Sequence, residues 1–197
     1  MRTIHTIAHS LLLGMVLLIL GAGSAPAADS TSAERSGDGL NLFTTFTKRV
    51  GETWDSGSYD IYVPLYTWHN RFMYDDRKIR QYNEEPWGFG IGKSMYDEDG
   101  DWHALYAMGF ADSHKQFQPM LGYAFIKNWY LNEARDFALG AGFTVGVTAR
   151  HEYDYIPLPL PLPLISVQYK RFSIQAAYVP GLYNDGNVLF TWFRLNI

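Results

Sequence analysis

The strongest constraint on the fold is a hydrophobic period of two that begins near Tyr59 and recurs along the rest of the chain. The clearest example covers residues 137–150, where large apolar side chains such as Leu139, Phe143 and Val145 alternate with glycine, alanine and threonine. Side chains of a β-strand point alternately to its two faces, so this spacing predicts strands whose faces differ in character. Gly, Asn, Asp and Pro lie between the runs and are typical of turns.

Eight such runs indicate an all-β domain over residues 55–197. They are expected at residues 59–69, 87–96, 102–111, 119–130, 137–150, 162–169, 172–180 and 187–197. Beyond the N-terminal leader, no run of about 20 apolar residues provides a membrane-spanning helix, and lipid otherwise accepts only closed sheets. The sequence therefore predicts an eight-stranded antiparallel transmembrane β-barrel, with strand lengths typical of small outer-membrane proteins.

Residues 1–27 have the pattern of a secretory signal peptide. Arg2 provides a positive start, residues 11–20 form an apolar core, and small residues up to Ala27 provide a cleavage site. The apolar core is short for a membrane anchor, which is the alternative interpretation. Residues 28–39 are rich in Ser, Asp, Glu and Gly and are expected to form a flexible lead.

The hydrophobic period is helical over residues 40–54. Leu42 and Phe46 fall on one side of a helix, and Lys48 and Arg49 fall on the other. This spacing predicts a short amphipathic helix. Two placements stay open: the helix plugs one end of the barrel, or it lies at the membrane interface with its basic residues toward lipid headgroups.

Composition excludes several classes of function. The 197-residue chain contains no Cys, which excludes disulfides and thiol chemistry. Its formal net charge is -4 and it has no basic block, so a nucleic-acid partner is not expected. No group of residues has metal-ligand spacing and no Gly-rich phosphate loop occurs, so neither a metal nor a cofactor is predicted.

The connections between the predicted strands alternate in length. Short connections cover residues 97–101, 131–136 and 170–171, whereas those at 70–86 and 151–161 are long. Outer-membrane barrels have short periplasmic turns and longer external loops. Every odd-numbered strand is therefore expected to end at the external rim.

Three side chains with complementary chemistry are expected at that rim. His69 ends the first strand, and Asp112 and Ser113 follow the third. A base, a carboxylate and a hydroxyl are the groups that acyl transfer requires. The alternative is that His69 is a hydrogen-bonding residue of the rim and that Asp112 and Ser113 make a turn.

The inner face of the strand at residues 137–150 is small and barely polar. Its glycines and threonines would leave an apolar slot inside the barrel, where a channel would have charges and a solid core would have bulk. The alternative is a sandwich of ordinary packing with incidental glycines.

Four prolines fall where a closed sheet should have none. Pro64 lies within the first strand and Pro86 opens the second, while Pro163 opens the sixth and Pro180 closes the seventh. Because proline lacks the N–H donor, each pair of strands should have a gap in its hydrogen bonds, and in a membrane such a gap is a lateral opening for lipid. Alternatively, these prolines lie just beyond strand ends, above all Pro86 and Pro163.

Segments that cover about residues 40–197 resemble the lipid A palmitoyltransferases of Gram-negative outer membranes. The matching stretches are residues 59–64, 67–69, 71–72, 82–84, 86–88, 102–103, 105–108, 112–113, 142–144, 146–150, 155–159, 180–181, 183–184 and 186–188. The resemblance implies an eight-stranded outer-membrane barrel with a periplasmic N-terminal helix. It also implies transfer of an acyl chain from the sn-1 position of a phospholipid to a hydroxyl on an acyl chain of lipid A.

The resemblance assigns roles to residues at the external rim. It implies that His69, Asp112 and Ser113 are the catalytic residues and face the outside. Lys78 matches a position for lipopolysaccharide recognition, and Tyr183 matches one for phospholipid gating.

The resemblance also concerns the lateral openings and the slot. Pro163 and Pro180 match the gate for phospholipid, and Pro64 and Pro86 match a second lateral gate. Ala124 matches the floor of the acyl slot, where the best-known members have glycine. Its extra methyl group predicts acyl chains slightly shorter than palmitate, because protein interiors are packed without slack.

The expected partners are a phospholipid acyl donor and a lipid A acceptor, and the expected state is a monomer or weak homodimer. Two other functions stay open: a non-enzymatic outer-membrane barrel for adhesion or membrane integrity, and a soluble lipid-carrying barrel. A packed, charged interior would favour the adhesion or integrity barrel. A polar outer face would favour the soluble carrier, because exposed apolar side chains are costly in water.

Overall fold

The computed structural model describes residues 32–197, so the predicted signal peptide and the first residues of the lead lie outside the described residues. The chain forms two compact units, Met1–Phe43 and Thr44–Ile197. The strands and the candidate site belong to the second unit, and every side-chain contact reported below lies within it.

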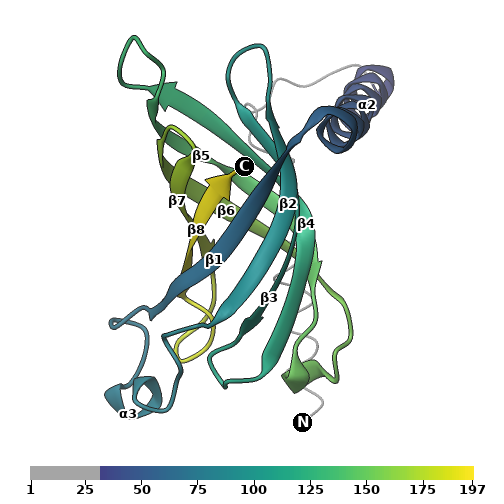
Figure 1. Cartoon of the computed structure of the whole chain (residues 1–197). Coiled ribbons are helices and arrows are strands. Elements are labelled where there is room, and N and C mark those ends of the chain that lie inside the picture. The colour runs from purple at the N-terminus through teal and green to yellow at the C-terminus, as the bar shows by residue number, and fades with distance from the viewer. Residues whose placement is uncertain (1–31) are drawn as a thin grey trace. The chain divides into compact units, whose positions relative to one another are not determined.

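Eight antiparallel strands pair in sequence order and close into a barrel, in which β8 returns to pair with β1 (Figure 1). The strands are β1 Ser58–His69, β2 Gly88–Tyr96, β3 Trp102–Ala111, β4 Phe117–Tyr130, β5 Phe137–Thr148, β6 Leu158–Tyr169, β7 Phe172–Val179 and β8 Val188–Asn196. This arrangement confirms the predicted eight-stranded antiparallel barrel, and most strand bounds agree with the prediction to within two residues.

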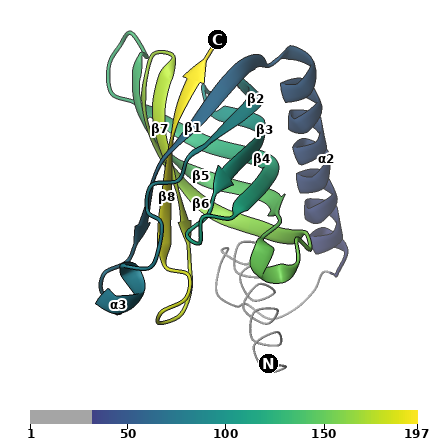
Figure 2. The same cartoon turned by 60° about the horizontal axis from the view of Figure 1, so that its bottom comes forward.

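The two rims of the barrel differ in the length of their connections. The turn rim carries the connections at 97–101, 131–136 and 170–171. The loop rim carries four other connections, at 70–87, 112–116, 149–157 and 180–187. The short helices α3 Asp76–Ile79 and η1 His151–Tyr153 lie in two of these loops, and Figures 1 and 2 show α3 beside the β7–β8 loop.

The sixth strand begins at Leu158 rather than at residue 162, and it contains Pro159, Pro161 and Pro163. The N–H groups of alternate residues point to alternate neighbours, so prolines two residues apart all lack donors toward the same strand. The ladder with β5 is continuous along β6, whereas the ladder with β7 begins only at Leu164. The proline run therefore pairs with β5 and does not pair with β7.

Helix α2 spans Ser32–Ser56 and is longer than the predicted 40–54. Residues 32–39, predicted as part of the flexible lead, continue the helix. Their composition suggested disorder, but Thr31 and Glu34 have the sequence spacing of a capping box, which is a signal for a helix start.

The part of α2 from Thr44 onward lies against the outside of the barrel. Phe46 packs edge-on against Tyr123 of β4, with ring centroids 4.9 Å apart, and Arg49 bonds Glu98 in the β2–β3 turn at 3.0 Å. Tyr123 and His103 belong to the outward-facing rows of their strands, yet both are buried. This part of the helix therefore covers an outer patch at the turn rim and does not plug the barrel.

The outward face of the barrel is an apolar belt. Exposed aliphatic side chains project from six of the strands, among them Ile91, Leu121, Leu139, Val145, Ile165, Val167 and Ile174. Exposed aromatic side chains lie near both rims, including Tyr59, Trp129, Tyr169 and Phe172 at the turn rim and Tyr66, Phe72, Trp87 and Phe117 at the loop rim. Such a belt with aromatic girdles is typical of transmembrane barrels, and it argues against the soluble carrier. Within residues 32–197, no helix has both the length and the apolar character of a membrane span.

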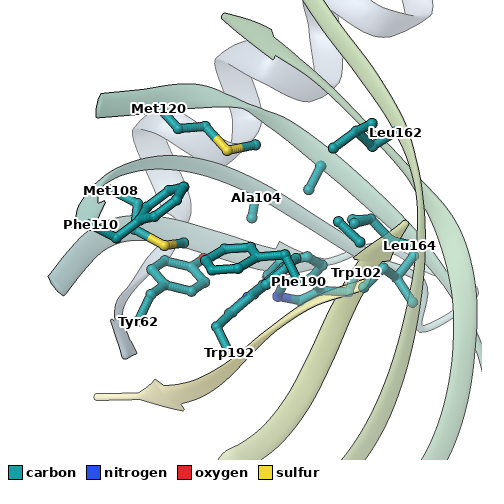
Figure 3. Packing of buried hydrophobic residues seen from close by; sticks show 13 residues of the cluster. Tyr62, Trp102, Ala104, Met108, Phe110, Met120, Leu162, Leu164, Phe190 and Trp192 are labelled. Carbon is teal, nitrogen blue, oxygen red and sulfur yellow. The ribbon is translucent and has the colours of Figure 1, made fainter. Parts of the chain in front are cut away.

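The interior has two halves of opposite character. On the turn-rim side, Arg194 and Asp60 form an ion pair of 3.0 Å, and both side chains are fully buried. On the loop-rim side the interior is an apolar cluster, in which the rings of Phe110 and Phe190 stack at 4.6 Å beside Trp192 (Figure 3). A polar layer therefore closes the barrel beneath an apolar chamber.

The chamber is narrower than the glycines of β5 suggested. A Cβ at Gly140 would lie 2.4 Å from Ile126, and one at Gly122 of β4 would lie 3.0 Å from the Tyr106 hydroxyl. Gly140 thus accommodates a large neighbouring side chain, whereas Gly142 and Gly146 lie against the backbone of β4. An eight-stranded barrel is just wide enough for side chains to fill. What remains is a narrow apolar cleft between the side chains of the cluster, with Ala124 in its lining.

Candidate active site

His69 and Ser113 meet at the loop rim. His69 is the last residue of β1 and is 1% exposed, and Ser113 lies in the β3–β4 loop. His69 Nε2 is 3.0 Å from Ser113 Oγ, which is a hydrogen bond. The structure therefore brings together two of the three residues that the sequence singled out. An imidazole that contacts a hydroxyl in this way has the geometry of a base beside a nucleophile.

Asp112 does not contact His69 through a hydrogen bond. Its Oδ1 accepts the backbone N–H groups of His114 at 2.8 Å and Gln116 at 2.9 Å. A short carboxylate commonly bonds the backbone two residues ahead and so shapes a turn. Within the described chain, its Oδ2 is buried and has no hydrogen-bond partner. Asp112 thus forms the loop that presents Ser113, and the carboxylate beside His69 is a different one.

That carboxylate belongs to Glu84, for which the sequence predicted no role. Glu84 Oε1 lies 3.0 Å from His69 Nδ1, and it also accepts the backbone N–H of His69 at 3.2 Å. Glu84 is in the β1–β2 loop, two residues before Pro86. Composition and spacing do not distinguish Glu84 from Glu85 beside it, although residues 82–84 belong to a stretch that matches the family and Glu85 does not. A signal for its role would have been its place just before β2, which brings the loop back beside the end of β1.

Glu84 is itself held by two further side chains. Arg71 donates from Nη1 to Oε1 at 2.7 Å and from Nη2 to Oε2 at 2.5 Å, and the Tyr66 hydroxyl donates to Oε2 at 2.7 Å. Burial opposes ionisation of Glu84, but the bonds from Arg71, Tyr66 and His69 outweigh it and lower its pKa to about 2. Glu84 is therefore an anion across the physiological pH range. We call Glu84, Arg71 and Tyr66 the Glu84 clamp.

Aromatic rings fix the plane of the imidazole. The ring of Tyr82 stacks on His69 with centroids 4.7 Å apart, and Tyr74 meets it edge-on at 5.4 Å. Tyr82 also contacts His114, the residue after Ser113, at 5.2 Å. The rings therefore connect the β1–β2 loop to the β3–β4 loop around His69.

Lys78 and Tyr183 lie in a second set of contacts at the loop rim. Asp75 accepts bonds from the Tyr183 hydroxyl at 2.7 Å and from Asn184 Nδ2 at 2.8 Å. Lys78 donates to the backbone carbonyl of Asn184 and lies 5.9 Å from the centre of the Tyr82 ring. The structure therefore joins the β1–β2 and β7–β8 loops next to the ring that stacks on His69.

The barrel has two gaps in its hydrogen-bonded ladders, each beside a proline. Pairing between β1 and β2 ends at Tyr62 and Gly90, although β1 continues to His69. Pairing between β6 and β7 ends at Leu164 and Ala177, next to Pro163. The predicted gaps are therefore present in the pairing, and both open toward the loop rim.

Pro64 lies inside β1, beyond the last pair with β2, whereas Pro86 precedes β2 and Pro180 follows β7. Pro163 does not open its strand, as predicted, but lies inside β6.

Ala124 lies in the apolar cleft and is buried. It pairs with Ala104 on β3 and with Thr144 on β5, near the middle of β4. Tyr62 and Trp102 line the same cleft. A linear apolar group that entered from the loop rim would approach Ala124 from the side of Met108 and Met120. Within the described residues, no group of three or more His, Cys, Asp or Glu side chains is arranged to hold a metal ion.

Comparison with known proteins agrees with this geometry. Residues 49–194 match a family described as antimicrobial peptide resistance and lipid A acylation protein PagP. A lipid A acyltransferase PagP of Yersinia enterocolitica is 50% identical over 188 residues, which cover 94% of this chain and 92% of the relative. That of Proteus mirabilis is 55% identical over 168 residues, which cover 85% of this chain and 78% of the relative. That of Yersinia pestis is 54% identical over 154 residues, which cover 78% of this chain and 77% of the relative. The family match includes every residue of the loop-rim site, and we conclude that the chain belongs to the PagP family of lipid A acylation proteins.

Proposed function

We propose that this protein is an outer-membrane lipid A acyltransferase that takes its acyl chain from the sn-1 position of a phospholipid. Lipid A acylation follows from the family and from the names of the relatives. The apolar outer belt is consistent with the outer membrane. The observation that carries the proposal is the contact of His69 with Ser113 at the mouth of an apolar chamber.

The proposed reaction moves an acyl group between two oxygens. A hydroxyl on an acyl chain of lipid A gives its proton to His69 Nε2, and its oxygen bonds to the sn-1 carbonyl carbon. The bond from that carbon to the glycerol oxygen breaks, and His69 returns the proton to this oxygen as lysophospholipid leaves. Ser113 Oγ is 3.0 Å from Nε2, the position of a hydroxyl that His69 can deprotonate. The proton balance is the same whether Ser113 is acylated first or the lipid A hydroxyl attacks directly.

The apolar chamber would hold the donor chain, with palmitate or a slightly shorter chain reaching toward Ala124. The cleft is lined by large apolar side chains and is closed by the Arg194–Asp60 layer, so its depth is defined. In this proposal Ala124 is the floor of the slot. Its methyl group replaces the hydrogen of a glycine and shortens the slot accordingly.

The two ladder gaps are the proposed routes for lipid. The gap at Pro163 and Pro180 would admit phospholipid, with Tyr183 in the loop above it, and the gap at Pro64 and Pro86 would serve lipid A. A gap in a closed sheet removes the backbone bonds that a lipid would otherwise have to break.

The loop rim is proposed to face the cell exterior, because outer-membrane barrels have their longer loops outside. Arg77 and Arg80 are exposed beside Lys78 in the β1–β2 loop. Such a group of basic residues suits lipid A phosphates. Residues 1–27 would direct export, and residues 28–31 would precede α2 in the mature chain.

Mass spectrometry of lipid A tests this function. Cells that express the parent chain should contain lipid A with one additional acyl chain, and cells with His69→Ala or Ser113→Ala should lack it. Heat-dependent gel migration verifies that each variant forms a barrel. If a folded His69→Ala barrel still added the chain, or if the parent added none, the proposal would be wrong.

A further inference from the structure

We propose that Glu84 is the positioning residue of the active site, which orients His69 for proton transfer while Arg71 and Tyr66 hold it. The inference rests on the proposed function, because the reaction defines the proton that His69 must accept. Glu84 does not touch the reacting atoms, so it acts through the imidazole.

The two ring nitrogens of His69 have different partners. A neutral imidazole has one N–H donor and one acceptor nitrogen. A carboxylate accepts hydrogen bonds and cannot donate them, so the contact of 3.0 Å from Glu84 requires the proton on Nδ1. Nε2 is then the acceptor for the Ser113 hydroxyl at 3.0 Å. Glu84 therefore selects the tautomer in which the basic nitrogen points at the hydroxyl.

Glu84 also restrains the main chain of His69. The same Oε1 accepts the His69 backbone N–H at 3.2 Å and the ring Nδ1–H at 3.0 Å. One atom thus binds both the backbone and the ring of a single residue at the end of β1. Rotation of the ring away from Ser113 would break the Nδ1 bond while the backbone bond keeps the carboxylate in place.

The remaining bonds of Glu84 fit a fixed anion rather than a proton acceptor. Arg71 bonds both oxygens and Tyr66 bonds Oε2, so the carboxylate accepts five hydrogen bonds in all. A carboxylate has about four lone-pair sites, so none remains for a proton. Its pKa of about 2 agrees with this saturation. Glu84 therefore stabilises an imidazolium when His69 takes the substrate proton, and it does so against the positive charge of Arg71.

Asp112 cannot fill this role in the observed geometry. Its Oδ1 bonds the backbone of His114 and Gln116, within its own loop. Asp112 places Ser113, and Glu84 places His69. The two carboxylates therefore position the two members of the base–hydroxyl pair separately.

The test compares Glu84→Gln with the matched control Glu85→Gln in the full-length protein, purified in detergent with phospholipid and lipid A as substrates. Both variants remove one negative charge from adjacent positions, and Glu85 is exposed. The Glu84 backbone carbonyl accepts the N–H of Thr67 at 2.9 Å, and this bond survives either change. We expect kcat to fall by about 10²-fold in Glu84→Gln with KM nearly unchanged, within the range of general-base effects, and to stay at the parent value in Glu85→Gln.

A spectroscopic readout separates positioning from simple loss of structure. Nitrogen-15 NMR of the imidazoles should show His69 in the Nδ1–H form in the parent and in Glu85→Gln. In Glu84→Gln the Nε2–H form should increase, since an amide can donate to Nδ1. Glu84→Asp retains the charge at a shorter reach and should recover part of both kcat and the Nδ1–H population.

A second variant covers the case in which Glu84→Gln does not fold. Tyr66→Phe removes one donor to Oε2 from a partly exposed side chain and should lower kcat several-fold. A kcat and tautomer equal to those of Glu85→Gln, in whichever of these variants folds, would overturn the positioning role and leave the acyltransferase proposal intact. An inactive parent would instead contradict the acyltransferase proposal, and the tautomer would still report on the Glu84 contact.

Discussion

At the loop rim, two carboxylates position different residues of the site. Glu84 faces the imidazole of His69, and Asp112 folds the backbone that carries Ser113. Asp112 is buried and Glu84 is partly buried, so the hydrogen bonds that they accept on their buried sides are stronger than exposed ones. The chemistry therefore depends on which backbone and side-chain donors each carboxylate meets.

The low pKa of Glu84 predicts a pH-dependent contribution to stability. An ordinary Glu titrates near 4.5, and Glu84 titrates near 2 in the folded protein. Because the folded pKa is the lower one, the contribution is complete above about pH 4.5 and is lost as the pH falls toward 2. Glu84→Gln should therefore lower the thermal unfolding midpoint relative to Glu85→Gln at pH 7, and this difference should shrink at pH 2.5. A difference that stays constant over this range would contradict the prediction.

The methyl group of Ala124 predicts a preference in acyl length. Ala124→Gly should lengthen the slot and favour chains about one methylene longer, because no neighbouring atom fills the added space without repacking. The measurement is the distribution of acyl lengths transferred from a mixture of phospholipids. Ala107→Gly is a control, because Ala107 faces outward on β3. Identical distributions for the parent and Ala124→Gly would show that Ala124 does not limit chain length.

At the scale of elements, β6 combines a complete ladder on one side with an interrupted one on the other. Its three prolines are spaced two residues apart, so the N–H donors that they lack would all have faced β7. Continuing the β6–β7 register would place residue 163 opposite Tyr178 and residue 159 beyond the end of β7 at Val179. The gap is therefore a consequence of sequence spacing, and single substitutions can test it.

Restoring a donor at position 163 should close part of the gap. Pro163→Val adds an N–H toward the Tyr178 carbonyl and a side chain with high β-propensity. We expect a higher unfolding midpoint and a several-fold lower kcat/KM for the phospholipid donor. Pro159→Val makes the same chemical change where no β7 residue is opposite, and it should behave like the parent. Equal transfer rates in the two variants would mean that phospholipid does not enter through this gap.

At the scale of the whole molecule, a buried polar layer separates the apolar chamber from the turn rim. Arg194 pairs with Asp60, bonds Ser94 at 3.1 Å and lies over the Trp102 ring at 4.8 Å. Asp60 also accepts from Tyr62 at 3.0 Å. Buried charges of this kind are tolerated when each has partners, and removal of one leaves the other exposed to an apolar environment.

Arg194→Leu should therefore destabilise the barrel by about 3–5 kcal/mol, because Asp60 would remain buried without its cation. The double variant Asp60→Asn with Arg194→Leu should recover a large part of this loss. Denaturant-induced unfolding in detergent measures both values. If the single and double variants were equally unstable, the Asp60 charge would not be the cause.

The architecture could be predicted from the sequence, because a period of two and alternating connection lengths are local properties of the chain. They predicted eight strands, the shared rim of His69 and Ser113, and the two proline gaps. Local patterns also have limits: the composition of residues 28–39 concealed a helix start, and the glycines of β5 did not reveal how closely Ile126 and the β4 backbone approach them.

The carboxylate that bonds His69 is identified by contacts in the folded chain. Glu84 and Glu85 are adjacent and chemically alike, and Asp112 is the acidic residue next to Ser113 in sequence. The choice depends on how the β1–β2 loop returns past Arg71 and Tyr66, whose bonds turn Glu84 toward the end of β1. Hydrogen bonds between residues 13 and 18 positions apart leave no periodic trace in a sequence, so the family match could include Glu84 but could not show that it orients His69.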